Sequence, residues 1–322
     1  MADIGDGRPG EYFKKILGKH YVDARIRKLT IHEDGLPPIA AHFLYPAFKR
    51  GKPSVTELVA MLMDEITGFC ATKAQRREAK HRDAEDIYES KAIEELARWA
   101  KKLFIKAQAK ESRSGEGGEL LLYVLIEHFL KAPLVLSKMR LKTSIAMPVH
   151  GADGVHARWD EEGQNLTMFF GESKMHSTFA GAMKDAAKSI GEIAKNIDDR
   201  LNHELQLTTG HIDLDGFPDE LREYLLRFLH PYITEEGNNR TDRFAILLGY
   251  DYHIYSKLTG IDNTKAEQEF LIHYKKSLRR SLETAQLHLN EQEIDLSSVD
   301  LFLFPMPDVQ DFRDMFQEEL NG

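Results

Sequence analysis

The stretch DGVHARWDEEGQNLTMFFGESKMH, residues 153–176, decides the fold that we expect for this chain. Two segments with strand-like patterns, 153–160 and 166–175, flank a short polar turn, and this arrangement predicts a β-hairpin. If the turn centres on Glu162 and Gly163, the numbers of opposed residues sum to 325. The glycine would then supply the positive φ that a tight turn needs.

This register puts apolar residues on one face of the hairpin and mostly polar residues on the other. A slip by one residue would mix the two faces. The opposed apolar pairs are Val155–Phe170, Ala157–Met168 and Trp159–Leu166. The other face of the first strand holds Gly154, His156, Arg158 and Asp160. We therefore expect the hairpin to be half-buried.

At the open end of the hairpin the same register brings two acids together. Asp153 faces Glu172, and Lys174 lies two residues further along the same face. Opposed carboxylates repel each other unless a cation such as Mg²⁺, or Mn²⁺ in its place, neutralises them. Such a metal activates water and stabilises charge on a phosphoryl group, and Lys174 would position that water or stabilise the charge. The alternative is an ordinary salt bridge on a solvated strand face.

Glu119 is a further candidate for this site. It opens a predicted helix at 119–131, one face of which holds Leu122 and Ile126. If that helix packs on the apolar side of the hairpin, Glu119 hangs over the two acids. Two other interpretations stay open: Glu119 interacts only with the positive end of the helix dipole, or Glu116 takes its role.

The rest of the chain predicts a mixed α/β arrangement of the α+β class. Strands are expected at 24–32, 134–142, 243–255 and 299–304, and helices at 83–108, 178–203, 218–230, 264–289 and from Asp308. Another helix is expected after Ser54, which has capping-box spacing to Glu57. The Ser/Gly/Glu stretch 111–118 predicts a boundary between a mostly helical N-terminal region, 1–110, and a second domain, 111–322, with a C-terminal α/β elaboration.

Composition limits the functions that we consider. Apolar residues make up 42% of the 322 residues, enough for a sizeable core, and the net charge of −9 argues against DNA binding through the whole surface. The single Cys70 excludes a disulfide framework and a Cys-based zinc site. We see neither a signal region nor an apolar run approaching the ~20 residues of a membrane span, so we expect a cytoplasmic protein without membrane contact.

Two groups of basic residues are candidates for DNA contacts. Lys138, Arg140 and Lys142 share one face of a predicted strand and could contact phosphates beside the acids. A solvated edge-strand face explains them equally well. Lys184 and Lys188, near the start of helix 178–203, could guide a nucleic-acid backbone or simply favour solubility.

The order and spacing of the candidate acids along the chain resemble those of a known superfamily. Glu119 on a helix, Asp153 after an irregular HGA stretch, and Glu-Ser-Lys after an apolar strand resemble the PD-(D/E)xK restriction-endonuclease-like superfamily. The core of that superfamily consists of a helix, a three-stranded meander, a helix and a further strand, as expected here for 119–203. The sequence departs from its Pro-Asp pair, because Ala152 precedes Asp153.

A narrower resemblance rests on four segments. SGEGGELLLYVLIEHFL, HGADGVHARW, FGESKMH and FLFPMPDVQDFRDMF together resemble HamA, the family of nuclease subunits of Hachiman anti-phage defence. The resemblance implies a Mg²⁺-dependent deoxyribonuclease that HamB, a superfamily 2 helicase, restrains until it engages DNA. It also implies a catalytic set of Asp153, Glu172, Lys174 and Glu119, with the metal bound by Asp153, Glu172 and the main-chain carbonyl of Ser173. A non-catalytic adaptor for a helicase and an RNase with the same core are the alternatives.

Overall fold

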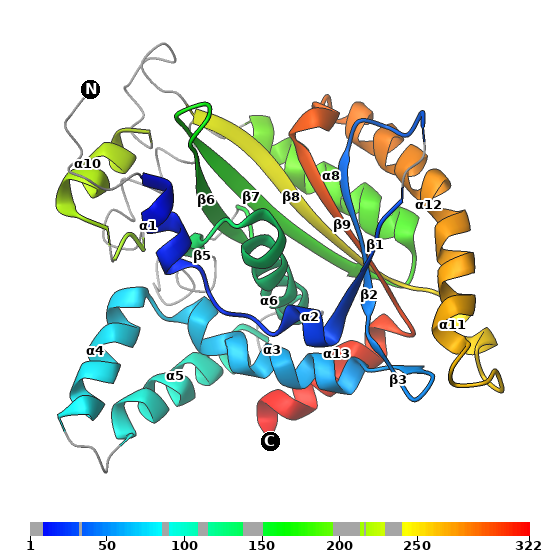
Figure 1. Ribbon diagram of the computed structural model, residues 1–322, viewed down its shortest axis with the longest axis horizontal. Coiled ribbons are helices and arrows are strands. Elements are labelled where there is room, and N and C mark those ends of the chain that lie inside the picture. Colours follow the sequence, from blue (N-terminus) through cyan, green and yellow to red (C-terminus); the bar gives the residue numbers. More distant parts are fainter. Residues whose placement is uncertain are drawn as a thin grey trace.

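A computed structural model describes residues 9–31, 34–85, 90–108, 115–137, 151–195, 213–215, 217–228 and 240–322. Its main feature is a seven-stranded sheet (Figure 1). The strands are β1 (Ile26–Leu29), β2 (Ala40–Pro46), β5 (Leu134–Ser137), β6 (Gly154–Asp160), β7 (Asn165–His176), β8 (Arg240–Asp251) and β9 (Val299–Met306). Two short strands, β3 (Phe48–Lys49) and β4 (Lys52–Pro53), pair separately.

The strand order is β1-β2-β9-β8-β7-β6-β5. The four central strands β2, β9, β8 and β7 run parallel, whereas β1 at one edge and β6 and β5 at the other are antiparallel to their neighbours. The sheet therefore combines the predicted meander, β5–β6–β7, with a parallel extension. The expected mixed α/β arrangement is confirmed.

Helices cover both faces of this sheet (Figure 1). One face packs against α8 (Phe179–Lys195) and α12 (Ala266–Glu291), and the other against α3 (Val55–Cys70), α6 (Glu116–Leu125) and α13 (Val309–Asn321). The remaining helices are α1 (Pro9–Ile16), α2 (Val22–Arg25), α4 (Lys73–Ala84), α5 (Lys91–Gln108), α10 (Asp219–Phe228) and α11 (Ile254–Lys257). A π-helical turn, η1 (Ile126–Leu130), and a 3-10 turn, η3 (Leu296–Ser298), complete the secondary structure. None of the described helices is both long and apolar enough to cross a membrane.

The predicted hairpin register is confirmed at every pair. Val155 opposes Phe170, Gly154 opposes Gly171, and all other β6–β7 partners keep the same sum of residue numbers. The turn itself differs from the prediction, because the positive φ, 45°, belongs to Gln164 and not to Gly163. The register depends on which side chains share a face. The predicted register is therefore correct although the positive φ was assigned to the wrong turn residue.

The prediction of a half-buried hairpin was wrong. Residues such as Met168 and Phe170 face α8, and the alternate residues Phe169 and Met175 belong to the core around α6. His156, expected on a polar face, is buried, and its Nδ1 lies 2.8 Å from the carbonyl oxygen of Ala132. Burial lowers the pKa of this imidazole to about 4, so it is neutral at physiological pH. Helices on both faces turn an apparently amphipathic strand into a fully enclosed one.

Other boundaries differ in detail. The structure has two helices where one was expected at 83–108: α4 ends at Ala84, and α5 begins at Lys91. The predicted capping box after Ser54 does not form: the Ser54 hydroxyl donates to the carbonyl oxygen of Ala47 instead. Strands β1 and β2, from the first 110 residues, join the same sheet as the rest, and the division of the chain at residue 110 stays a prediction.

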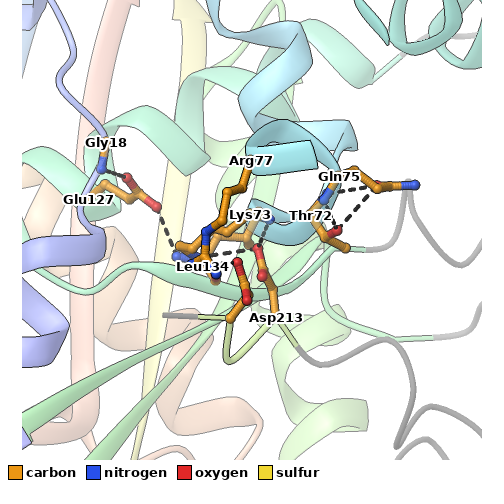
Figure 2. A network of polar contacts seen from close by, with 9 residues as sticks. Gly18, Thr72, Lys73, Gln75, Arg77, Glu127, Leu134 and Asp213 are labelled. Carbon is orange, nitrogen blue, oxygen red and sulfur yellow. Dashed lines mark hydrogen bonds and ion pairs between the residues drawn. The ribbon is translucent and has the colours of Figure 1, made fainter. Parts of the chain in front are cut away.

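The edge strand β5 is anchored through both main-chain groups of Leu134 (Figure 2). Its N–H donates to a carboxylate oxygen of Glu127 at 2.9 Å, and its carbonyl accepts from Lys73 Nζ at 3.2 Å. Lys73 opens α4 and also contacts the carboxylate of the buried Asp213 through its main-chain N–H and its ammonium. A capping box formed by Thr72 and Gln75 fixes this helix start.

Glu127 also ties the N-terminal segment to η1. Its carboxylate accepts from the Gly18 N–H at 2.6 Å and lies 3.0 Å from His20 Nε2, while His20 Nδ1 lies 2.9 Å from Glu65. Burial disfavours the imidazolium, but the two carboxylates outweigh burial and raise the pKa of His20 to about 9. Burial likewise opposes ionisation of Glu127, yet its hydrogen bonds hold its pKa below the usual value. The pair is thus charged at neutral pH inside the fold.

Candidate active site

Asp153 lies one residue beyond the last β6–β7 pair and bonds to both neighbours of Glu172. Its main-chain N–H donates to the carbonyl oxygen of Gly171 at 2.8 Å. Its carboxylate accepts from the N–H of Ser173 at 2.9 Å. The Asp153 and Glu172 side chains are both buried, and the hairpin register places the two residues together. The hairpin turn therefore brings together two acids that are 19 positions apart in the sequence.

Lys174 contacts the second acid directly. Its ammonium lies 2.5 Å from a carboxylate oxygen of Glu172, and the lysine side chain is 27% exposed whereas the glutamate is 6% exposed. The enclosed carboxylate and the more accessible ammonium thus occupy the boundary between core and solvent. This placement permits a charged substrate group to approach Lys174.

The main chain of β7 supplies a third kind of group. In a strand, the N–H and C=O of one residue point to the same side. Because the Ser173 N–H points toward Asp153, the Ser173 carbonyl points to that side too. Glu172 N–H and C=O point the other way, toward β8, with which β7 is paired in parallel. The Asp153 side of β7 therefore presents a carboxylate and a carbonyl oxygen close together.

Glu119 opens a helix that packs on a different side of the hairpin than the prediction required. Helix α6 packs on the face of β7 that carries Gly171, where Leu122 and Ile126 lie within 3.4 Å of a Cβ built on that glycine. This is the face opposite Val155 and Phe170, so the condition that we set for Glu119 is not met. Glu119 is nevertheless buried, in the first turn of α6. Glu116, its competitor, is buried one turn earlier.

Gly118, which the sequence did not single out, allows α6 to approach the site. A Cβ on Gly118 would lie 2.8 Å from Met175 Cγ and 3.1 Å from Ser173 Oγ. We expect Gly118→Ala to push this helix away from β7 and to destabilise the protein by about 1–3 kcal/mol. Gly115→Ala is the matched control, because a Cβ there meets nothing within 4 Å. Urea unfolding of both variants measures the difference; equal losses would contradict the close packing.

The basic candidates divide into two groups. Lys138, Arg140 and Lys142 lie outside the described residues, so their role stays a prediction. Lys184 and Lys188 are exposed on α8, whose other side packs against β7 and β8. Their ammonium groups are therefore accessible to a ligand in solution.

The donor set has a definite chemical character. Within the described residues, no three His, Cys, Asp or Glu side chains gather into a group that could hold a metal ion. The site offers instead two carboxylates, from Asp153 and Glu172, and the carbonyl of Ser173. Mg²⁺ typically takes one or two protein carboxylates and completes its shell with water and substrate phosphate. These residues fit Mg²⁺ and do not fit a structural zinc site, which needs four protein ligands.

Comparison with known proteins identifies the family of the chain. The HamA family model matches residues 19–320, nearly the whole chain. The chain belongs to the HamA family. Comparison with curated proteins gives no match. HamA is a component of a two-part anti-phage defence system, Hachiman, and the match includes both halves of the hairpin together with α6 and most of α13.

Proposed function

We propose that this HamA protein is a metal-dependent DNA endonuclease, the effector subunit of a two-component defence complex that a partner helicase restrains and activates. The observation that carries the proposal is the meeting of Asp153 with the Glu-Ser-Lys segment, through the 2.9 Å hydrogen bond to Ser173 and the 2.5 Å contact between Glu172 and Lys174. Membership of the HamA family supports a role in anti-phage defence.

Asp153, Glu172 and the Ser173 carbonyl would hold the metal. When bound, Mg²⁺ supplies a Lewis acid that lowers the pKa of water and offsets negative charge on phosphate. The chain itself contributes fixed geometry: Asp153 is bonded to the main chain on both sides of Glu172, so its carboxylate is already held beside that residue. Lys174 would orient the attacking water or donate to a phosphate oxygen, as its partial exposure permits.

The proposal predicts cleavage that depends on the metal. We expect the full chain, together with the partner helicase and ATP, to cut plasmid DNA in Mg²⁺ or Mn²⁺. Excess EDTA should abolish cleavage, and restored Mg²⁺ should recover it, because the ligands themselves are unchanged. Agarose electrophoresis of plasmid with and without each component is the measurement.

The same experiment separates the alternatives. Cleavage of RNA but not of DNA of the same sequence would make the protein an RNase. Binding to the helicase without cleavage of either substrate, and without Mn²⁺ binding, would make it an adaptor. Either result would overturn the proposed deoxyribonuclease.

A further inference from the structure

The end of β7 has a strand neighbour on only one side in the described sheet. Pairing with β6 stops at Gly171, whereas pairing with β8 continues to His176. The main-chain groups of Ser173 and Met175 point to the side where β6 has ended, because groups of alternate residues share a side. Among the described residues, the contacts on that side of residues 172–176, which contain the proposed catalytic segment, are therefore made by side chains and not by a paired strand.

Two side chains supply such contacts. Asp153 accepts from the Ser173 N–H, as described above. Arg313, in the second turn of α13, donates from its guanidinium to the carbonyl oxygen of Met175 at 2.6 Å. Met175 directly follows Lys174, and Arg313 lies 138 positions away in the sequence. The two contacts thus bracket Lys174, one residue before it and one residue after it.

Arg313 extends from a firmly held helix. The first N–H of α13, at Val309, donates to the carboxylate of Asp251 at the end of β8, at 2.7 Å. Asp308 caps the same helix by accepting from two main-chain N–H groups. Phe312 and Phe316, on either side of Arg313, are buried against Gly117 in the first turn of α6. The helix that carries Arg313 is therefore held at its start and packed against α6.

The surroundings of this contact are compact. A small hollow beside it is lined by Gly117, Gly118, Met175, Phe312, Arg313 and Phe316. The Met175 side chain lies over Gly249 of β8 and against Gly118 of α6. Met175 is thus confined by β8, α6 and α13 at once, so a change at Arg313 acts on the catalytic segment with little room for compensation.

We propose that Arg313 is a positioning residue of the catalytic site: its hydrogen bond to the Met175 carbonyl holds the side of β7 that lies beyond the end of β6 and thereby sets the placement of Lys174 and of the Ser173 carbonyl. The consequence for cleavage rests on the proposed nuclease function, whereas the effect on the strand does not. A planar guanidinium suits this half-buried position better than a lysine ammonium, which is a more strongly hydrated point charge.

Two measurements on the full chain test the proposal. Hydrogen exchange followed by mass spectrometry reports the protection of peptides that cover 171–178. Cleavage kinetics with Mg²⁺ and the partner helicase report the activity of the catalytic site. The variants are Arg313→Ala, Arg313→Gln and Arg313→Lys, and the control is Glu319→Ala, an exposed residue on the same helix. Thermal unfolding identifies any variant that fails to fold, and the milder Gln and Lys variants then carry the test.

We expect Arg313→Ala to exchange faster in this peptide and to lower kcat by about 10- to 100-fold, because a small displacement of catalytic groups has effects of this size. KM for DNA should change little, added guanidinium should restore part of the activity, and Glu319→Ala should match the natural protein. Unchanged exchange in folded Arg313 variants would overturn the proposal, as would faster exchange with undiminished cleavage. Absence of cleavage by the natural protein would refute the nuclease function alone, and exchange would still decide the role of Arg313 in the strand.

Discussion

Lys174→Ala is expected to lower Mg²⁺-dependent DNA cleavage by about 100- to 1,000-fold, the size of effect that follows the loss of one preorganised charge in an active site. The ammonium lies 2.5 Å from the Glu172 carboxylate and is the more exposed of the two groups. Its removal takes away the cation that would contact water or phosphate. The carboxylates that would bind the metal remain.

Measurements of metal affinity therefore distinguish the role of Lys174 from that of the acids. We expect Mn²⁺ affinity, measured by calorimetry, to persist in Lys174→Ala and to fall at least about tenfold in Asp153→Asn, since the proposed first shell then loses a charged ligand. Lys257→Ala, at an exposed position on α11, is the matched control for removal of a lysine. Cleavage by Lys174→Ala at the rate of the natural protein would remove Lys174 from the proposed site.

Glu127→Ala is expected to destabilise the protein by about 3–5 kcal/mol, the loss typical when one partner of a buried ion pair is removed. The Glu127 carboxylate bonds to His20, to the Gly18 N–H and to the Leu134 N–H. Its loss would leave the charged His20 with Glu65 alone and two main-chain donors without their acceptor. Urea unfolding measures the change, and Glu283→Ala, exposed on α12, is the control.

The same pair predicts the pH dependence of stability. The folded pKa of His20, about 9, exceeds its unfolded value of about 6.5, so its contribution of about 3 kcal/mol is complete below pH 6.5 and is lost as the pH rises toward 9. The lowered pKa of Glu127 acts in the opposite sense, and its contribution is lost as the pH falls below its unfolded value of about 4.5. Stability from this pair should therefore be greatest between about pH 5 and 6.5.

Urea titrations at pH 6 and pH 9 check this expectation. The natural protein should lose stability between the two values, and Glu127→Ala should lose less, because removal of the carboxylate lowers the folded pKa of His20. His253→Gln, at an exposed histidine, should behave as the natural protein does. Equal pH dependence in Glu127→Ala and the natural protein would show that other groups cause it.

The predictions that were wrong are those that depended on how helices and loops pack against the sheet. Alternation along β6 predicted a polar, solvated face, yet α6 covers that face and buries His156. The role of Glu119 was made conditional on a helix packed against the apolar face of the hairpin, whereas α6 packs against the face that carries Gly171. Ser54 has the spacing of a helix cap, but its hydroxyl finds the Ala47 carbonyl in the folded chain. In each case a partner outside the strand or helix competed with a preference within it and provided the better contact.

The hairpin register was determined by the sequence alone, and with it the meeting of Asp153, Glu172 and Lys174, because a period of two and a short turn are local properties. Tertiary structure decided which helix covers each face and that α6 approaches β7 closely at Gly118. It also decided that Arg313 and Glu127 bond to main-chain groups 138 and 109 positions away. Local patterns carry no information about such partners, since their contacts exist only once the sheet and both helical layers have assembled.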